Sequence, residues 1–183
     1  SIFTKHKIKS NDSKNLKILF IGRLVKEKNI LNLSNLIEKI NIKMKSFHEL
    51  IVIGDGILKH EMSKNSSTKL LGIKSQNEII EIAKICDLFC LPSNYEPWGV
   101  VIHEMTSLGL PILCSYDCGG GFDLVINDYN GYKFNDLEEF EISLNKFINL
   151  NKSERQRFSI NSKTISQKLN HESWNSTLNS LVK

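Results

Sequence analysis

Residues 16–22 read Leu-Lys-Ile-Leu-Phe-Ile-Gly, an almost uninterrupted apolar run that stops at a glycine. A run of this kind predicts a strand that is buried on both faces, because a strand with one face in water alternates apolar and polar residues. Residues 29–40 follow, with isoleucine and leucine at helical spacing. The first recognisable unit of the chain is therefore a strand, a loop and a helix.

The same unit recurs along the chain. Further strands are predicted at 48–53, 69–71, 88–91, 111–114 and 131–134, with helices at 58–64, 77–86 and 100–108 and two or three more within 136–183. Strands that alternate with helices indicate an α/β fold with a parallel sheet. We therefore predict a Rossmann-like parallel sheet of about six strands with helices on both faces, plus C-terminal helices.

Length and composition narrow the class of protein. The chain has 183 residues, which predicts a single domain over 1–183 with a polar lead-in over 1–16. Hydrophobic residues make up 40% and charged residues 24%, which excludes an intrinsically disordered chain. The net charge of +4 gives no support for nucleic-acid binding, and no apolar run approaches the ~20 residues of a membrane span. Because no signal peptide is visible, we expect a cytoplasmic protein.

Four cysteines, at positions 86, 90, 114 and 118, form two pairs with the pattern C-x3-C. Structural zinc sites usually show C-x2-C or C-x4-C on a turn. Cys90 and Cys114 also fall within predicted strands, where a thiol packs as a small hydrophobic group. We therefore predict structural thiols, and neither a metal site nor a disulfide.

The loops that follow the strands are the candidate sites, because ligands bind beyond the carboxyl ends of parallel strands. These loops are 22–28, 54–56, 72–74, 92–99 and 115–123. The first contains Arg23 and Lys28, whose cationic groups can bind phosphate oxygens, although loop cations are often simply solvated. The last contains glycines 119–121, which allow either close approach of a ligand or a flexible surface loop.

The loop that leads into helix 100–108, together with the start of that helix, contains the largest number of candidate binding residues. The first turn of a helix has free N–H groups and the positive end of the dipole, which favour an anion. Gly99 has no Cβ, so a phosphate or a sugar can approach its backbone. Glu104 lies among apolar neighbours and needs a partner, which the two hydroxyls of a vicinal diol would supply; a solvated helix face is the alternative. Trp98 either stacks on a sugar or covers the start of the helix.

Several common sites are excluded or weakened. No G-x-x-x-x-G-K-[ST] motif occurs, which excludes an ordinary P-loop NTPase. Gly54-Asp55-Gly56 is not completed to G-x-G-x-x-G, because position 59 is lysine. No Asp-x-Asp pair is present, which weakens a metal-assisted diphosphate site.

Four blocks, at 21–28, 50–56, 92–104 and 120–131, together resemble the C-terminal domain of the family-4 retaining glycosyltransferases. These enzymes have the GT-B architecture of two facing Rossmann-like domains. The third block contains the family's signature of two glutamates with seven residues between them, here Glu96 and Glu104. The resemblance extends over about 17–134, with a weaker match in the C-terminal helices.

The resemblance implies a site for a nucleotide-sugar donor, linked to UDP or GDP, with no metal and no further cofactor. Arg23 and Lys28 match the basic pair that holds the donor diphosphate and stabilises charge on the departing nucleotide. Fixed cations can do this without a metal ion. Glu96 matches the residue near the donor sugar and the anomeric centre, so the resemblance assigns it to catalysis together with the two cations. Glu104 matches the residue that holds the ribose hydroxyls.

The resemblance also implies that main-chain groups complete the donor site. Backbone N–H groups around Trp98, Gly99 and Val100 are expected to contact sugar and phosphate, and Gly22 is assigned to the same binding site. Ile73 stands where the family's main chain meets the base. The family often has phenylalanine at the position of Trp98, and this departure leaves the identity of the sugar open.

Family members carry a second domain ahead of this one, which binds the acceptor. Only 1–16 precede the first predicted strand, so we expect that the N-terminal acceptor domain is missing and that this chain alone is inactive. The full enzyme would build a bacterial cell-surface glycan on a glycan or lipid-linked acceptor, with peripheral contact at the inner membrane face. A helix around Trp174 resembles the segment that returns to the first domain. A non-catalytic nucleotide-binding or assembly domain and a fragment of a GT-B sugar-nucleotide epimerase remain alternatives.

Overall fold

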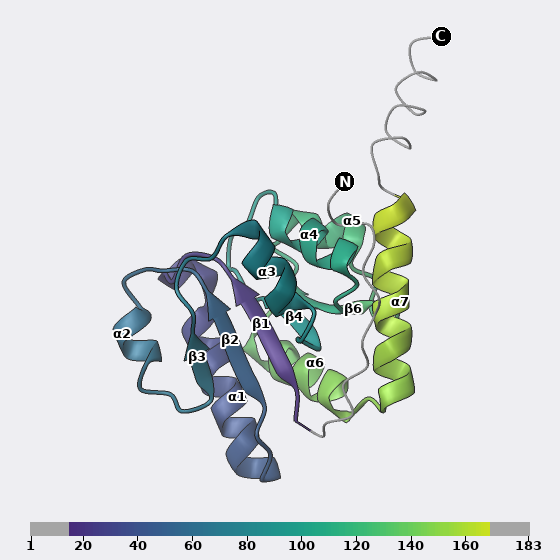
Figure 1. Cartoon of the computed structure of the whole chain (residues 1–183). Helices are drawn as coiled ribbons and strands as arrows, with labels where there is room; N and C mark the ends of the chain where they lie inside the picture. Colours follow the sequence, from purple (N-terminus) through teal and green to yellow (C-terminus); the bar gives the residue numbers. More distant parts are fainter. Residues whose placement is uncertain (1–14, 169–183) are drawn as a thin grey trace.

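The computed structural model describes residues 15–168, which form a parallel sheet with helices around it (Figure 1). The strands are β1 Lys17–Ile21, β2 Glu49–Ile53, β3 Thr68–Leu70, β4 Leu88–Leu91, β5 Ile112–Ser115 and β6 Gly131–Phe134. The helices are η1 Lys26–Lys28 (a 3-10 helix), α1 Ile30–Met44, α2 Lys59–Met62, α3 Gln76–Ala83, α4 Val100–Leu108, α5 Gly119–Leu124, α6 Leu137–Asn149 and α7 Lys152–Lys168.

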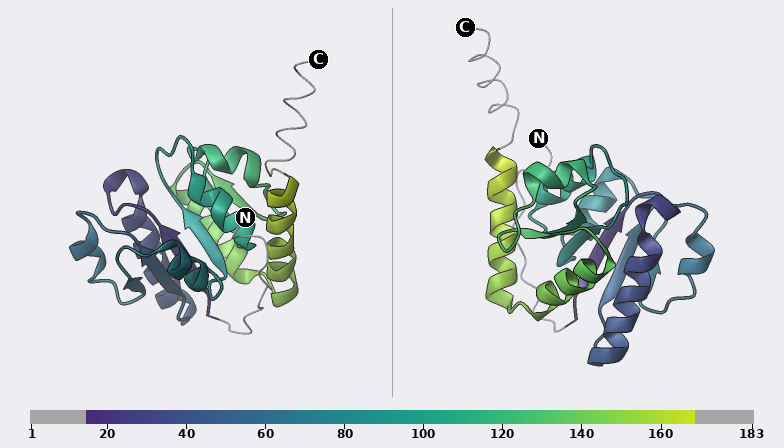
Figure 2. Two further views of the ribbon diagram at one scale, coloured as in Figure 1. Left: turned by 45° about the horizontal axis from the view of Figure 1, so that its top comes forward. Right: turned by 180° about the vertical axis from the view of Figure 1, so that it is seen from behind.

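Both faces of the sheet are covered by helices. α3 and α4 lie on one face and α1 and α6 on the other, and α7 packs beside α4 and α5 (Figures 1 and 2). The strand order is β3-β2-β1-β4-β5-β6, and every pairing is parallel. The predicted Rossmann-like α/β fold with C-terminal helices is confirmed.

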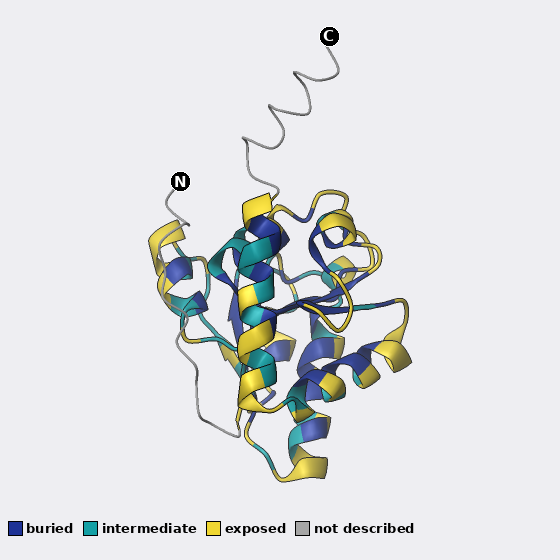
Figure 3. Ribbon diagram, turned by 90° about the vertical axis from the view of Figure 1, so that its right-hand side faces the viewer, coloured by how far each residue is buried: buried dark blue, intermediate teal, exposed yellow. Residues whose placement is uncertain are grey.

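The inner strands β1, β2, β4 and β5 are largely apolar because helices remove both of their faces from water, whereas the edge strand β3, Thr68–Leu70, is only partly covered. Ile18, Leu19 and Phe20 of β1 are each 0% exposed. Figure 3 shows the strands as buried and the outer faces of the helices as exposed. The continuous apolar run at 16–21 therefore marks a central strand, as predicted.

The order of strands reverses at β1. This strand pairs with β2 along its whole length and with β4 on its other side through Ile18 and Leu19. The chain runs outward from β1 to β3, returns to β4 beside β1, and then runs outward again to β6. In sheets of this kind the crevice between the carboxyl ends of the two strands at the reversal is the ligand site. The loops that follow β1 and β4 flank that crevice.

Three predicted helices have different bounds in the structure: the helix predicted at 58–64 is shorter, as α2, and the other two are α1 and α3. α1 continues past 40 to Met44, because no glycine or proline stops it, and Lys45 ends it in the left-handed conformation with φ 51°. The helix predicted at 77–86 ends at Ala83, so Cys86 lies beyond it. Ser75 caps the start of α3, because its side chain accepts a hydrogen bond from the backbone N–H of Glu78 in a capping box.

The prediction of a loop over 115–123 is wrong in its second half, because Gly119–Leu124 forms α5. Gly119 lets α5 pack closely against the loop before α4, because a Cβ on this residue would lie 2.0 Å from the carbonyl oxygen of Pro97. No side chain fits in that space. α5 is therefore seated directly on the backbone of the loop that leads into α4.

The C-terminal helices are fixed to the domain by aromatic contacts. Phe140 of α6 stacks on Phe134 of β6 with the ring centroids 4.4 Å apart. Phe158 of α7 packs edge-on against Phe147 of α6 at 6.2 Å. Two of the helices predicted within 136–183 are thereby confirmed, whereas the predicted helix around Trp174 lies outside the described residues.

Candidate functional site

The loop after β1 is held above the edge of the sheet by the neighbouring loop after β2. The backbone N–H of Gly22 donates to the backbone carbonyl of Ile53 at 3.0 Å, and the N–H of Leu24 donates to the backbone carbonyl of Asp55 at 2.9 Å. The side chain of Leu24 is 0% exposed and anchors the loop in the core. Arg23, between these two anchored residues, is exposed and forms no ion pair with the other residues of 15–168. Its guanidinium group is free to bind an anion.

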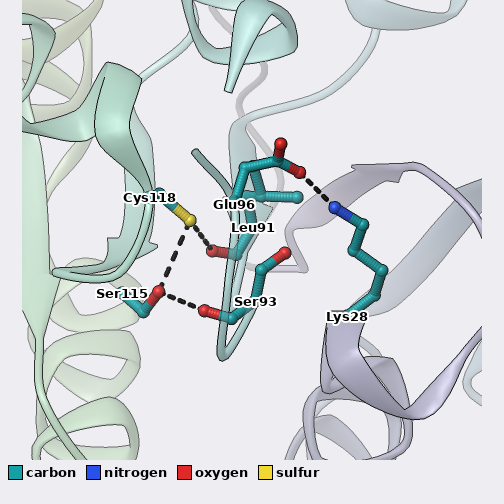
Figure 4. A network of polar contacts seen from close by, with 6 residues as sticks. All are labelled: Lys28, Leu91, Ser93, Glu96, Ser115 and Cys118. Atoms are coloured by element: carbon teal, nitrogen blue, oxygen red, sulfur yellow. Dashed lines mark hydrogen bonds and ion pairs between the residues drawn. The ribbon is translucent and has the colours of Figure 1, made fainter. Parts of the chain in front are cut away.

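Lys28 and Glu96 form an ion pair across the crevice between β1 and β4 (Figure 4). Lys28 ends η1 after β1, whereas Glu96 lies on the loop after β4, 68 residues later in the chain. The two side chains are only 13% and 21% exposed. The backbone reinforces the contact, because the N–H of Asn94 donates to Glu27 at 2.9 Å. The structure therefore brings together two of the three residues assigned to catalysis.

The loop from Glu96 to Gly99 is fixed from the side of β5. The backbone N–H of Glu96 donates to the backbone carbonyl of Asp117 at 3.1 Å, and the N–H of Gly119 donates to the backbone carbonyl of Glu96 at 2.8 Å. Gly99 then caps α4 in the left-handed conformation, with φ 55°, which a side chain would disfavour. The first turn of α4, beginning at Val100, thus opens beside the Lys28–Glu96 pair.

Glu104 lies on the second turn of α4 and is half-buried. Within 15–168 its carboxylate has neither a hydrogen-bond partner nor an ion-pair partner, and burial raises the pKa of this carboxyl, against a smaller opposing effect of His103. A desolvated, unpaired carboxylate has open acceptor positions, which suits a ligand that presents two adjacent hydroxyls.

The loop after β4 rests on a small buried polar network (Figure 4). The hydroxyl of Ser115 donates to the backbone carbonyl of Ser93 at 2.5 Å. The thiol of Cys118 contacts the Ser115 hydroxyl and the carbonyl of Leu91, each at 3.4 Å. Nothing in the sequence pattern pointed to these residues, because they meet only through the pairing of β4 with β5. All four cysteines are free thiols, and burial raises the pKa of Cys118.

Exposed apolar side chains gather on the same edge of the sheet. Each follows a strand, and the set comprises Ile57 (84% exposed), Ile73 (81%), Tyr95 (71%), Trp98 (81%), Val100 (66%) and Phe122 (77%). Trp98, directly before the Gly99 cap of α4, leaves most of its surface in solvent. Exposed apolar groups around a polar crevice are typical of a surface that binds a ligand or another protein surface.

Within 15–168 no three His, Cys, Asp or Glu side chains are grouped so that they could hold a metal ion. In the same part of the chain no helix combines the length and the apolar character needed to cross a bilayer.

Comparison with known proteins agrees with this geometry. Residues 1–165 match the family described as glycosyl transferases group 1. A galactosyltransferase of Escherichia coli, described as UDP-Gal:alpha-D-GlcNAc-diphosphoundecaprenol alpha-1,3-galactosyltransferase, is 33% identical over 132 residues, covering 66% of this chain and 33% of its own length. The chain therefore belongs to the group 1 glycosyltransferases, and the resemblance to the C-terminal domain of the family-4 retaining enzymes is confirmed.

Solved structures share the fold. A TarM mutant from S. aureus, crystallised with Fondaparinux, alpha-GlcNAc-glycerol and UDP, has a TM-score of 0.79 at 19% identity and covers 95% of this chain but 37% of its own. The isolated C-terminal domain of a group 1 glycosyl transferase (LpcC) from Francisella tularensis has a TM-score of 0.73 at 18% identity. The match covers 84% of this chain and 85% of that domain. The chain thus spans about a third of the length of the galactosyltransferase and most of the isolated domain.

Proposed function

We propose that this chain is the donor-binding domain of a metal-independent retaining glycosyltransferase, and that its ligand is a UDP-linked sugar. The observation that carries the proposal is the Lys28–Glu96 pair, which lies across the crevice between β1 and β4 where such sheets bind ligands. A cation for a phosphate and a carboxylate for a sugar hydroxyl are thereby set side by side.

Each residue has a role that its surroundings support. Among the described residues Arg23 is exposed and forms no ion pair, and with Lys28 it would neutralise the diphosphate as the bond to the sugar breaks. The first turn of α4, at Gly99 and Val100, offers backbone N–H groups to the same phosphates. Glu104 would accept hydrogen bonds from the two ribose hydroxyls, which fits its unpaired, half-buried carboxylate.

We propose UDP as the nucleotide because the names of two similar proteins include it. The galactosyltransferase of Escherichia coli is named for UDP-Gal, and the S. aureus structure contains UDP. The first of these names also supports a cell-surface glycan as product and a lipid-linked acceptor. We extend both to this chain as part of the proposal.

The exposed apolar edge supports a second domain as partner. Trp98 and Phe122 are 81% and 77% exposed beside the crevice, which is the edge that faces the opposite domain in the GT-B architecture. An acceptor domain placed there would cover these side chains and exclude water from the donor sugar.

Calorimetry and a thermal-shift panel of UDP-, GDP- and ADP-sugars test the proposal. We expect a UDP-sugar to raise the melting temperature and to bind in the micromolar to millimolar range, about −4 to −8 kcal/mol. Glu104→Ala and Arg23→Ala should each weaken binding about tenfold or more, whereas Glu61→Ala, on an exposed face of α2, should leave it unchanged. Absence of binding by every nucleotide sugar in the panel would contradict the proposal.

A further inference from the structure

Ser93 carries a fully buried hydroxyl that has no hydrogen-bond partner within 15–168. The residue is 0% exposed, and its backbone carbonyl, unlike its side chain, is satisfied by Ser115. Buried hydroxyls in native proteins are almost always paired, so an unpaired one calls for a physical reason. The proposed roles of Arg23, Lys28, Glu96 and Glu104 make no use of it.

The position of Ser93 supplies that reason. It lies on the loop after β4, three residues before Glu96, and Figure 4 shows its hydroxyl on the side of the loop that faces Lys28. The hydroxyl is enclosed, so a ligand cannot reach it in this arrangement. In Figure 4 the side chains of Lys28 and Glu96, which are paired with each other, lie on the side toward which this hydroxyl points.

We propose that Ser93 is a positioning residue for Glu96: its hydroxyl donates to the Glu96 carboxylate once Lys28 leaves that carboxylate for the donor diphosphate. This inference rests on the proposed function. A diphosphate carries more negative charge than one carboxylate, so it competes for the ammonium group. Glu96, only 21% exposed, would then be a poorly solvated and unpaired charge. The Ser93 hydroxyl replaces the lost bond and keeps the carboxylate in place for the sugar.

Hydrogen bonds hold the backbone around Ser93, so the proposed rearrangement involves side chains only. The carbonyl of Ser93 is held by Ser115, and that of Leu91 is held by Cys118. The main chain of Glu96 is held on both sides, by the carbonyl of Asp117 and by the N–H of Gly119. With the main chain fixed, only the side chains of Ser93, Glu96 and Lys28 have to rearrange.

A double-mutant cycle with UDP as the probe tests the inference. Ser93→Ala should weaken UDP binding about tenfold, the effect of removing a hydrogen bond to a charged group. The same substitution in a Glu96→Ala background should have no further effect, because the carboxylate it serves is gone. Ser93→Thr, which keeps the hydroxyl, should retain the affinity. Ser162→Ala removes a serine that is also 0% exposed, on α7, and should not change UDP affinity.

The outcomes separate the two proposals. If the parent chain binds UDP but Ser93→Ala binds equally well, or loses the same factor with and without Glu96, the inference is overturned and the proposed function stands. If the parent chain binds neither UDP nor any UDP-sugar, the proposed function fails and the inference fails with it. A fall in UDP affinity that depends on Glu96 supports both.

Discussion

Glu104 is the residue at which stability and binding oppose each other. Burial without a partner raises the pKa of its carboxyl, so the folded protein holds this proton more tightly than the unfolded chain does. The contribution of Glu104 to stability is therefore fully present below its unfolded pKa and is lost as the pH rises through the raised folded pKa. At neutral pH the ionised carboxylate destabilises the folded state, and a ligand that hydrogen-bonds it removes that penalty.

Glu104→Gln should therefore raise the melting temperature at pH 7 and weaken UDP binding about tenfold or more. The gain in melting temperature should disappear below about pH 4, where the glutamate is protonated in both states. Thermal melts at both pH values, together with calorimetry at pH 7, measure the two effects. Glu61→Gln, on an exposed position of α2, is the control. A Glu104→Gln protein less stable than the parent at pH 7 would contradict the assignment.

At the scale of elements, α5 determines the shape of the loop before α4. The Gly119 backbone sits so close to the Pro97 carbonyl that a Cβ would lie 2.0 Å from its oxygen. The N–H of the same glycine donates to the backbone carbonyl of Glu96 at 2.8 Å. The position of Glu96 thus depends on a helix that follows a different strand.

Gly119→Ala should destabilise the domain by about 2 kcal/mol or more, because α5 or the loop must shift. It should also weaken UDP binding, since Glu96 moves with the loop. Gly72→Ala is the matched control: its φ is +70°, but a Cβ there meets nothing within 4 Å, so only backbone strain of about 1–2 kcal/mol applies. Urea unfolding of the two variants measures the difference, and an equal cost would show that close packing on Pro97 is unimportant.

At the scale of the whole molecule, the edge of the sheet that carries the Lys28–Glu96 pair is lined by exposed apolar side chains. Tyr95, Trp98 and Phe122 are each more than two-thirds exposed around it, at 71%, 81% and 77%. Transfer of a sugar requires an acceptor held against the donor and water kept out.

The isolated chain should therefore bind a UDP-sugar without transferring the sugar. A transfer assay with a lipid-linked acceptor, run on the chain alone and with an N-terminal acceptor domain supplied in trans, measures this. We expect product only in the second case. Product from the chain alone would contradict the need for a second domain, whereas persistent inactivity of the two together would favour a non-catalytic binding domain.

The amino-acid sequence by itself determined the six strands, most of the helices and the family. The continuous apolar runs at 16–21 and 88–91 specified strands buried on both faces, and the strand–helix alternation specified a parallel sheet. Glycine, proline and periodicity are local signals, so the bounds of β4, β6 and α4 agree with the prediction. The four blocks at 21–28, 50–56, 92–104 and 120–131, taken together, were enough to identify the family.

Only the tertiary structure decided which of these residues meet. The order of strands depends on how whole helix and strand surfaces pack, which no short window of sequence encodes. That order places β1 beside β4, and so pairs Lys28 with Glu96 although 68 residues separate them. It also encloses the Ser93 hydroxyl and seats α5 on the loop before α4. Local sequence carries the chemistry of each side chain, whereas long-range packing determines its partners.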